Sequence, residues 1–509
     1  MLVIKDLELY LKNDLRSLLT DFNFSLTDNH KVALVGEEGN GKSTLLKAIY
    51  DESLISSYID IRGEIFKSDE IIGYLPQQIE EKDRSFSTAK YFEKFVPSHT
   101  FDYGDFYKLV DQMEFDESRI SDKVLFRQLS GGEKIKFQLL CIMMQRPTIL
   151  LLDEPTNDLD IKSVEWLEDF IIYLSIPVIF VSHDEMLLEK CSSTIIHFEQ
   201  LIRKSKPHHS IAKMGYSDYI NKRDRMISHQ EQVARKEKEE YKKQMDKYHQ
   251  IYQKVEQEQR TISRQDPEGG RLLKKKMHSV KSMGKRFERE KENMTKRPDY
   301  EKSINVQFSN IFAIPSGRKI VDLDLKELKA GDKILSKNIK LELFGPKKIC
   351  IIGENGSGKT TLLRIIYNSV LENNLKPAYM PQDYLEMMDP ETNPVEFISE
   401  TGDKDELTAI RTYLGSMNFT KEEMFRPSKE LSGGQKAKLY FSKMIFNQAN
   451  VLILDEPTRN LSPLSGPEIR KALIEFEGCI ISVSHDRKYI SEVCDKVYEL
   501  DAYGLRGTN

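Results

Sequence analysis

The chain carries one set of sequence motifs twice, in the same order and with the same internal spacing. Each copy holds a glycine-rich stretch ending in Gly-Lys-Ser or Gly-Lys-Thr, a glutamine, Leu-Ser-Gly-Gly, Asp-Glu-Pro-Thr and Ser-His-Asp. The copies occupy residues 36–43, 77, 129–133, 150–156 and 182–184, and residues 353–360, 382, 431–435, 452–458 and 484–486. In both, the Leu-Ser-Gly-Gly serine lies 23 residues before the aspartate, and the glutamate lies 29 before the histidine. Two matched copies require two similar domains in one chain.

Composition describes a globular protein without a membrane segment. A length of 509 residues suggests about three domains of roughly 150 residues each. The longest apolar stretch, residues 171–181, is far shorter than the ~20 residues of a membrane span. The five cysteines show neither metal-ligand spacing nor a pairing pattern, which is typical of reduced thiols. With no signal peptide before the first strand-like pattern, we expect a cytoplasmic protein without membrane partners.

The segment between the copies, residues 213–300, differs from both of them. It holds 24 Lys and Arg against 15 Asp and Glu, a net charge of +9, and almost no Gly or Pro before Pro267. Its apolar residues recur at heptad spacing. They are Tyr241, Met245, Tyr248, Tyr252 and Val255, then Leu273, Met277, Val280 and Phe287. The pattern predicts an antiparallel helical hairpin. Its first helix would span about residues 218–260, on the order of 60 Å, with a tip around residues 256–270.

The hairpin leaves residues 1–212 and 301–509 as the two repeated domains. Short, continuously apolar runs precede the motifs in both, for example residues 149–152 and 451–454. Such strands suit a parallel sheet that helices cover on both faces. The sequence therefore predicts an α/β fold with two P-loop nucleoside-triphosphatase domains, joined by a long antiparallel helical hairpin.

The glycine-rich stretches, which we call the P-loops, are expected to bind nucleotide phosphates. Without Cβ atoms, backbone N–H groups can surround the phosphates, and the next helix directs its positive end at them. Lys42 and Lys359 should reach the β- and γ-phosphates. The predicted P-loop contacts are Gly36, Gly39, Asn40, Gly41, Lys42, Ser43 and Thr44, and Gly353, Asn355, Gly356, Gly358, Lys359, Thr360 and Thr361. The predicted Mg²⁺ ligands are Ser43, Gln77, Asp153, Thr360, Gln382 and Asp455.

Three further residue types in each copy suit hydrolysis of the bound nucleotide. The glutamate directly after the metal aspartate can polarise an attacking water, the histidine can contact the γ-phosphate, and the glutamine can sense water and metal. Such a site lowers the barrier mainly by positioning and charge stabilisation. The predicted catalytic residues are Glu154, Glu456, His183, His485, Gln77 and Gln382.

The combination of these motifs with Leu-Ser-Gly-Gly, the signature, resembles the ATP-binding cassette family and implies ATP as the nucleotide. In that family the signature of one cassette caps the nucleotide held by the other. The resemblance implies two composite sites, with Lys42 facing Ser432 and Lys359 facing Ser130, and a clamp that ATP closes. The implied signature contacts are Ser130, Gly131, Gly132 and Glu133, and Ser432, Gly433, Gly434 and Gln435.

Two aromatic residues are candidates for stacking on adenine. Tyr10 lies at a suitable distance before the first P-loop, and Phe312 is the candidate before the second. Either residue could instead be a core aromatic.

Residues 271–286 contain seven basic side chains and no acidic one. A solvated helix face usually alternates its charges. Basic residues without counter-charges favour a polyanion, above all nucleic-acid phosphate. Phosphate contacts alone would make such binding depend on shape rather than on sequence.

Two cassettes joined by a basic helical hairpin resemble the ABC-F family of ribosome-binding ATPases over essentially the whole chain. The resemblance implies a monomer with intramolecular cassette pairing that binds the 50S subunit, 23S rRNA and P-site tRNA. Its hairpin would extend towards the peptidyl transferase centre. Residues 263–277 and 455–465 are similar to the Lsa-type group, which protects ribosomes against lincosamides, pleuromutilins and streptogramin A. The implied function is ATP-gated ribosome protection.

One motif departs from the family pattern. The first Asp-Glu-Pro-Thr is followed by Asn157-Asp158-Leu159-Asp160, the usual form of the D-loop. The second is followed by Arg459-Asn-Leu-Ser-Pro, which lacks the acidic residues. The two sites therefore need not turn over equally.

Three alternative functions stay open. A housekeeping ABC-F translation factor would share every motif. The ATPase subunit of a membrane transporter would not need a hairpin of net charge +9. A chromosome-type ATPase would carry its coiled coil inside a cassette, whereas here both cassettes are whole.

Overall fold

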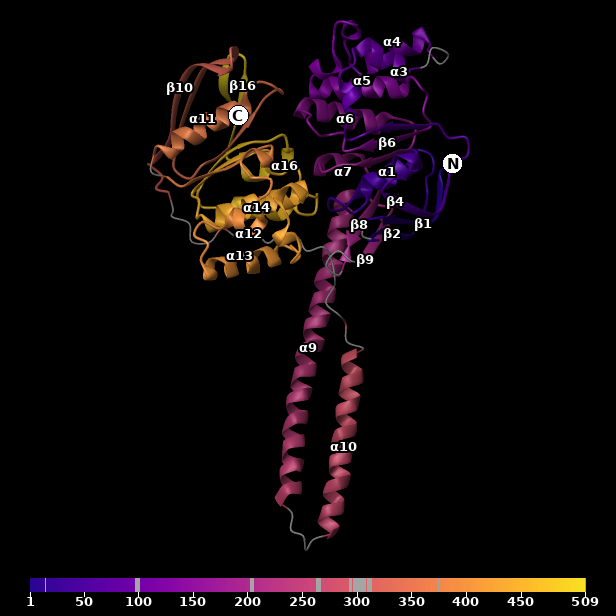
Figure 1. Ribbon diagram of the computed structural model, residues 1–509, viewed down its shortest axis with the longest axis vertical. Helices are drawn as coiled ribbons and strands as arrows, with labels where there is room; N and C mark the ends of the chain where they lie inside the picture. The colour runs from indigo at the N-terminus through magenta and orange to yellow at the C-terminus, as the bar shows by residue number, and fades with distance from the viewer. Residues whose placement is uncertain are drawn as a thin grey trace. The chain divides into compact units, whose positions relative to one another are not determined.

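The computed structural model describes residues 1–13, 15–96, 101–201, 206–261, 267–292, 295, 308, 314–373 and 375–508. Its chain forms two compact units (Figure 1). One unit joins Met1–Tyr216 to Glu301–Asn509 and contains both cassettes, and the other is Ser217–Tyr300. None of the helices in the described ranges combines the length and apolar character that crossing a membrane requires.

Each cassette is built on a six-stranded sheet, with strand orders β5-β6-β7-β3-β8-β9 and β13-β14-β15-β12-β16-β17. The first contains β3 (Lys31–Val35), β5 (Ile72–Leu75), β6 (Ile149–Asp153), β7 (Val178–Val181), β8 (Thr194–Gln200) and β9 (Lys206–Ala212). The second contains β12 (Lys348–Ile352), β13 (Pro377–Met380), β14 (Val451–Asp455), β15 (Cys479–Val483), β16 (Lys496–Asp501) and β17 (Gly504–Thr508).

The predicted parallel pairing is confirmed for five strands of each sheet. The sixth strand differs, because β9 pairs with β8, and β17 with β16, in the antiparallel sense. Both sheets are therefore mixed. Strands β3, β6, β7, β14 and β15 are buried at every residue, which explains their largely apolar sequences.

Additional antiparallel strands belong to each cassette. They are β1 (Val3–Leu11), β2 (Ser17–Ser25) and β4 (Ile59–Phe66), in the order β2-β1-β4, and the pair β10 (Lys319–Ala330) and β11 (Lys333–Phe344). These strands pack against the helices that follow the P-loops. In each cassette, apolar residues of the strands and of that helix belong to one hydrophobic cluster.

The helices of the two cassettes correspond in order. The first cassette contains α1 (Lys42–Tyr50), α2 (Glu81–Arg84), α3 (Thr88–Phe95), α4 (Tyr103–Gln112), α5 (Gly131–Met143), α6 (Ile161–Tyr173) and α7 (Glu185–Cys191). The second contains α11 (Lys359–Leu371), α12 (Pro394–Ile398), α13 (Lys404–Ser416), α14 (Gly433–Phe446), α15 (Gly466–Glu475) and α16 (Arg487–Val493). In both, a helix begins at the P-loop lysine and another at the signature glycines.

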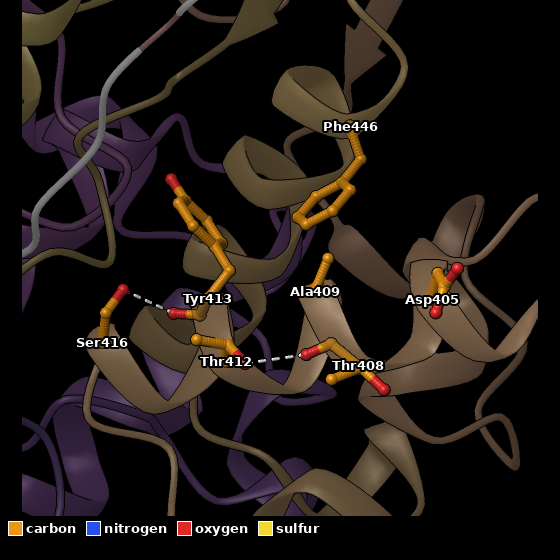
Figure 2. Close-up of a pocket in the computed structure, with 7 residues that line it drawn as sticks. All are labelled: Asp405, Thr408, Ala409, Thr412, Tyr413, Ser416 and Phe446. Carbon is orange, nitrogen blue, oxygen red and sulfur yellow. Dashed lines mark hydrogen bonds between the residues drawn. The ribbon is translucent and has the colours of Figure 1, made fainter.

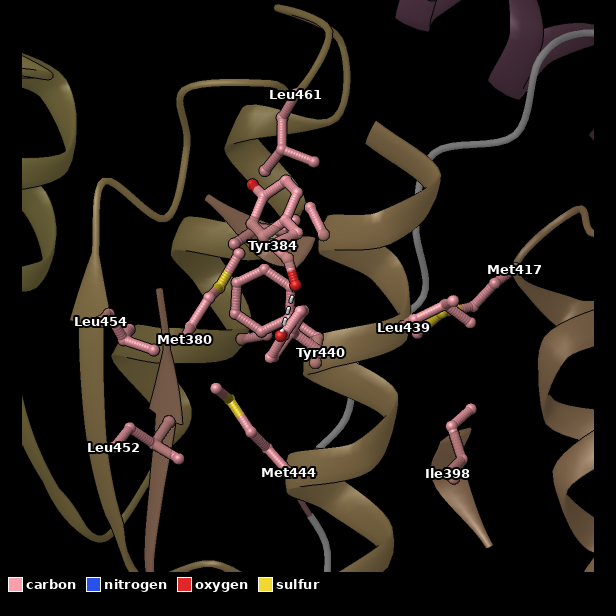
Figure 3. Close-up of a cluster of buried hydrophobic side chains, with 14 of the residues drawn as sticks. Met380, Tyr384, Ile398, Met417, Leu439, Tyr440, Met444, Leu452, Leu454 and Leu461 are labelled. Carbon is pink, nitrogen blue, oxygen red and sulfur yellow. Dashed lines mark hydrogen bonds between the residues drawn. The ribbon is translucent and has the colours of Figure 1, made fainter. Parts of the chain in front are cut away.

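A large hydrophobic cluster joins the sheet of the second cassette to its helices (Figure 3). Tyr384 and Tyr440 lie at its centre with ring centroids 5.6 Å apart, and the Tyr440 hydroxyl donates a 2.8 Å hydrogen bond to the Tyr384 carbonyl oxygen. Leu452 and Leu454 of β14 contribute from the sheet. This packing fixes the Walker B strand, β14, against the helix that carries the second signature.

The second unit consists of α9 (Tyr216–Thr261) and α10 (Pro267–Glu292), which lie side by side (Figure 1). The predicted heptad seam is confirmed at six of its nine positions, and the role of Tyr241, Met245 and Leu273 stays a prediction. Val255, Met277 and Val280 form a buried cluster to which Tyr248 and Tyr252 add. Tyr248 also packs edge-on against Phe287, with centroids 6.1 Å apart.

The tip of the hairpin differs from the prediction. Pro267 begins α10, and Gly269 and Gly270 lie in its first turn, so they do not form the break between the helices. Proline fits the first helical position because its missing N–H would have no partner there. Residues 262–266 of the predicted tip lie outside the described residues.

The Val280→Asp substitution should open the hairpin seam. Val280 is 7% exposed, and full burial of a valine stabilises by about 1.5–3 kcal/mol, which a carboxylate would lose. We expect faster amide hydrogen exchange throughout α9 and α10 and unchanged exchange in the cassettes. The neighbouring exposed Ser279→Asp is the matched control. Equal protection in both variants would contradict the seam.

Candidate active sites

Both P-loops fold back onto a strand of their own sheet, and this contact requires glycine. A Cβ at Gly36 would lie 2.3 Å from the carbonyl oxygen of Phe198, and one at Gly353 would lie 2.4 Å from that of Leu500. Their φ angles of 146° and 150° also belong to the region that favours glycine. The Lys42 ammonium donates to the carbonyl oxygens of residues 36 and 37 at 2.7 and 2.9 Å, which holds it inside the loop. The second P-loop repeats this arrangement with Lys359, at 2.8 and 3.0 Å.

A predicted metal ligand, Asp153 or Asp455, is the last residue of the Walker B strand in each cassette, β6 or β14. The Ser43 hydroxyl donates a 2.8 Å hydrogen bond to Oδ1 of Asp153. In the second site Oδ2 of Asp455 is buried and has no hydrogen-bond partner among the described residues. Burial raises the pKa of both aspartates. A hydroxyl beside a buried carboxylate suits Mg²⁺, which prefers oxygen ligands, so these residues fit the ion.

The two glutamates occupy a sharp turn directly after those aspartates. Glu154 and Glu456 have φ angles of 50° and 53°, which are uncommon for residues other than glycine. Their N–H groups bond to the carbonyl oxygens of Val181 and Val483, at 3.0 and 2.9 Å, and so hold the turns in place. Strained backbone of this kind clusters at functional sites.

The first glutamate lies among nitrogen donors. Gln77 Nε2 and Asn157 Nδ2 donate to Glu154 Oε2 at 2.7 and 2.8 Å, and His183 Nε2 lies 3.2 Å from Oε1. Burial by itself would raise the pKa of Glu154, but the contacts with His183 and Asn157 lower it to about 2. The carboxylate is therefore ionised at neutral pH.

The second glutamate has a different environment. It accepts a 3.2 Å hydrogen bond from the backbone N–H of His485, whose Nε2 lies 3.6 Å from Oε1. Burial and the neighbouring Asp455 raise the pKa of Glu456 to about 8. Burial and the positive charge of Lys359 lower the pKa of His485 to about 4. Arg459 takes the sequence position of Asn157, so the amide donor of the first site is missing here.

Each signature serine caps the helix that follows it. Ser130 Oγ accepts from the N–H of Glu133 at 3.3 Å, and Glu133 Oε2 accepts from the N–H of Ser130 at 2.7 Å. Ser432 and Gln435 form the same capping box. Glu133 and Gln435 were predicted to contact nucleotide, but their side chains are engaged in capping.

Each P-loop lies against the signature of the other cassette. Glu38 of the first P-loop accepts a 3.1 Å hydrogen bond from the N–H of Gly434. In the other direction, Asn355 Nδ2 donates to the carbonyl oxygen of Asp158 at 2.6 Å. A Cβ at Gly131 would lie 2.1 Å from that same oxygen and 3.4 Å from Asn355 Nδ2. The pairings expected from the family resemblance, first P-loop with second signature and second with first, are therefore adjacent.

The two D-loops meet between the sites. Arg459 Nη2 donates to Asp158 Oδ1 at 2.7 Å, so the unusual arginine of the second D-loop binds an acidic residue of the first. A small pocket there is lined by Asp158, Gln382, Asp383, Arg459 and Asn460. It brings the predicted Gln382 to the cassette interface. Sequence reasoning did not assign Asp158 and Glu38 to the sites, although both lie within recognised motifs.

The adenine-stacking candidates have different outcomes. Tyr10 lies on β1, its hydroxyl donates to Glu8 at 3.1 Å, and the Arg62 guanidinium lies 5.1 Å from its ring centroid. One face of the ring is thus beside a cation, and its role stays a prediction. Phe312 lies outside the described residues.

A second pocket contains none of the predicted site residues (Figure 2). It runs along α13 and reaches the last residue of α14. Its lining residues are Asp405, Thr408, Ala409, Thr412, Tyr413, Ser416 and Phe446. Because it carries no phosphate-binding or acid–base group in the arrangement described above, the active sites lie elsewhere.

Comparison with known proteins agrees with this geometry. The family described as "ABC transporter" matches residues 19–157 and 336–459, just over half of the chain. ABC transporter F family member 2 of Arabidopsis thaliana is 27% identical over 543 residues, covering 96% of this chain and 75% of the relative. ATP-binding protein Uup of Buchnera aphidicola is 28% identical, covering 97% and 79%.

Among solved structures, the fold is similar to that of an archaeal ribosome recycling factor, aABCE1, in its complex with the ribosomal stalk protein aP1. The TM-score is 0.61 at 18% identity, covering 99% of this chain and 90% of that one. At this identity the similarity concerns the fold alone. The repeated motifs, the paired P-loop and signature contacts and the family match agree: the chain belongs to the ATP-binding-cassette family and is an ATPase.

Proposed function

We propose that this ATPase binds the ribosome through its helical hairpin, and that ATP-driven pairing of the cassettes times the binding. The observation that carries the proposal is the exposed basic face of α10. All seven Lys and Arg residues between 271 and 286 are exposed. Ribosomal RNA is the polyanion that the resemblance to ABC-F ATPases indicates.

The basic face is largely uncompensated. Lys276 lies 3.9 Å from Glu258 of the opposite helix. Within the described part of the chain, no carboxylate comes within ion-pair distance of Arg271, Lys274, Lys275, Lys281 or Lys285. The apolar seam turns Met277, Val280 and Phe287 inward, and so leaves these cations on the outer face of α10. Cations fixed on a straight helix can follow the phosphates of a folded RNA.

The site residues have the following proposed roles. Lys42 and Lys359 bind the β- and γ-phosphates, and each signature closes over the nucleotide of the opposite cassette. Mg²⁺, held by Ser43 and Asp153 or by Thr360 and Asp455, supplies charge neutralisation at the phosphates when bound. The low pKa of Glu154 suits a carboxylate that orients the attacking water and stabilises the charge developing on it. Glu456 has the corresponding place in an environment that favours its protonated form, so the second site should turn over differently.

Replacing both glutamates by glutamine should separate ATP binding from hydrolysis. The Glu154→Gln/Glu456→Gln protein keeps the P-loops and signatures but loses both carboxylates, and we expect at least a ~100-fold lower ATPase rate. It should remain on ribosomes with ATP, in a pelleting assay that compares ATP with ADP. The exposed Glu93→Gln serves as a control. Hydrolysis by the double variant at the wild-type rate would disprove the assigned role.

Reversing charges on α10 should weaken ribosome binding without affecting ATP binding. Lys274→Glu/Lys275→Glu/Lys276→Glu removes about three phosphate contacts, so the slope of log affinity against log salt should fall by roughly two to three. The matched control reverses three lysines in the mixed-charge part of α9: Lys236→Glu, Lys238→Glu and Lys242→Glu. Equal loss in both variants would indicate net charge alone, and unchanged co-sedimentation of the α10 variant would contradict the interface.

We further infer that the protein protects ribosomes from antibiotics of the peptidyl transferase centre. The support is the similarity of residues 263–277 and 455–465 to the Lsa-type group, and a first hairpin helix of 46 residues. At 1.5 Å per residue such a helix is about 69 Å long, which suffices to reach from a tRNA site towards the catalytic centre. On this proposal the protein is cytoplasmic, and its tip acts near the P-site tRNA.

Cell-free translation inhibited by lincomycin or tiamulin tests this inference without a membrane, so export cannot contribute. Added protein should restore synthesis. Removing one heptad from each helix, residues 254–260 and 268–274, keeps the seam register but shortens the hairpin by about 10 Å. That variant should lose protection while retaining ATP hydrolysis. If the full chain binds ribosomes with ATP yet restores no synthesis, a housekeeping translation factor becomes the better interpretation.

A further inference from the structure

A second set of contacts joins the cassettes, and it consists of buried ion pairs outside the nucleotide motifs. Arg470 of α15 donates to the two carboxylate oxygens of Glu185 in α7, at 2.7 and 3.1 Å. Arg487 of α16 binds Glu168 of α6 through both of its terminal nitrogens. The four side chains are 4%, 9%, 15% and 3% exposed, so the charges are largely removed from water.

These four residues are equivalent in pairs. The spacing from the signature serine to the histidine of Ser-His-Asp is the same in both copies, so Glu154 corresponds to Glu456 and His183 to His485. In the same register Glu168 corresponds to Arg470, and Glu185 to Arg487. Each acidic residue of the first cassette therefore has a basic counterpart in the second.

The reversal extends to the residues that neutralise the pairs from within each cassette. Lys190 binds Glu168 at 2.7 Å in the first cassette, and Glu492 binds Arg470 at 2.7 Å in the second. Lys190 and Glu492 are again equivalent positions with opposite charges. Three equivalent positions are thus acidic, acidic and basic in one cassette, and basic, basic and acidic in the other.

Local packing is adjusted to one of these pairs. A Cβ at Gly466 would lie 2.5 Å from Glu185 Oε1 and 3.0 Å from Arg470 Nη1, so glycine makes the room that this pair occupies. Lys488 adds a second cation at 3.4 Å from Glu185. The equivalents of Gly466 and Lys488 in the first cassette are Val164 and Met186. The two faces are therefore different in shape as well as in charge.

We propose that this charge-reversed face selects the partner of each cassette, so that a first cassette pairs only with a second one. Two first cassettes in the same geometry would bring Glu168 against Glu185. Two second cassettes would bring Arg470 against Arg487. Burying an unpaired or like-charged group is costly, whereas the observed pairing gives every charge a partner. Possession of a P-loop and a signature cannot make this distinction, because both cassettes carry both motifs.

Charge exchange in the full chain tests the proposal. The basic chain carries Glu168→Arg, Glu185→Arg and Lys190→Glu, which makes both faces basic. The acidic chain carries Arg470→Glu, Arg487→Glu, Lys488→Met and Glu492→Lys, which makes both acidic. The exchanged chain carries all seven substitutions and so exchanges the charges of the two faces. ATPase rate, thermal unfolding and mass by light scattering are measured for each, without ribosomes.

The basic and acidic chains should each lose at least about tenfold in ATPase rate, as expected when buried pairs are replaced by like charges. The exchanged chain should recover most of the loss. An equimolar mixture of the basic and acidic chains should form a heterodimer of twice the mass and regain ATPase in a concentration-dependent way, because each first cassette then meets an oppositely charged second one.

Wild-type activity in the basic chain would overturn the proposal. So would a folded mixture that stays monomeric and inactive. If the exchanged chain does not fold, the mixture still tests the proposal, because it contains only the basic and the acidic chain, each altered in one cassette. None of these readouts involves the hairpin, so the result is independent of the proposed ribosome binding.

Discussion

The close approach of each P-loop to the signature of the other cassette is the constraint on which the rest of the structure depends. The contacts are short: Gly434 N–H to Glu38 at 3.1 Å, and Asn355 to the Asp158 carbonyl at 2.6 Å. At Gly131 of the first signature, a Cβ would lie 2.1 Å from the Asp158 oxygen of the same cassette and 3.4 Å from Asn355 Nδ2 of the other cassette. A cassette cannot supply both halves of its own site. The chain therefore needs two cassettes, a connection that lets them meet, and a surface that pairs them correctly.

The two sites are similar in backbone and different in electrostatics. Both glutamates occupy the same left-handed turn after a buried aspartate. Glu154 receives side-chain nitrogen donors from Gln77 and Asn157, whereas Arg459 replaces that asparagine in the second site and turns to Asp158 instead. One substitution in a D-loop thus removes a donor from one glutamate and adds a bond between the cassettes. The two glutamates therefore differ in their hydrogen-bond donors, although both follow a buried aspartate.

The hairpin places its apolar residues and its exposed cations on different faces of the same helices. Its heptad positions form a narrow apolar seam, and the exposed positions of α10 carry the positive charge. Because repulsion between exposed cations is screened by solvent, a modest seam is sufficient to hold the helices together. The cassettes carry the compensating negative charge, since the whole chain has a net charge of −5. Net positive charge is thereby concentrated in one segment.

Sequence by itself determined the features that depend on local patterns. Motif spacing identified two P-loop domains, apolar runs identified the buried parallel strands, and heptads identified a helical hairpin with its seam at Val255, Met277 and Val280. Tertiary structure alone decided which distant residues meet. The apolar runs did not predict that β9 and β17 pair in the antiparallel sense. Gly269 and Gly270 lie in the first turn of α10. The bonds from Glu38 to Gly434 and from Arg470 to Glu185 join residues hundreds of positions apart. No local pattern marks such pairs, because burial and charge complementarity arise only when both surfaces are in place.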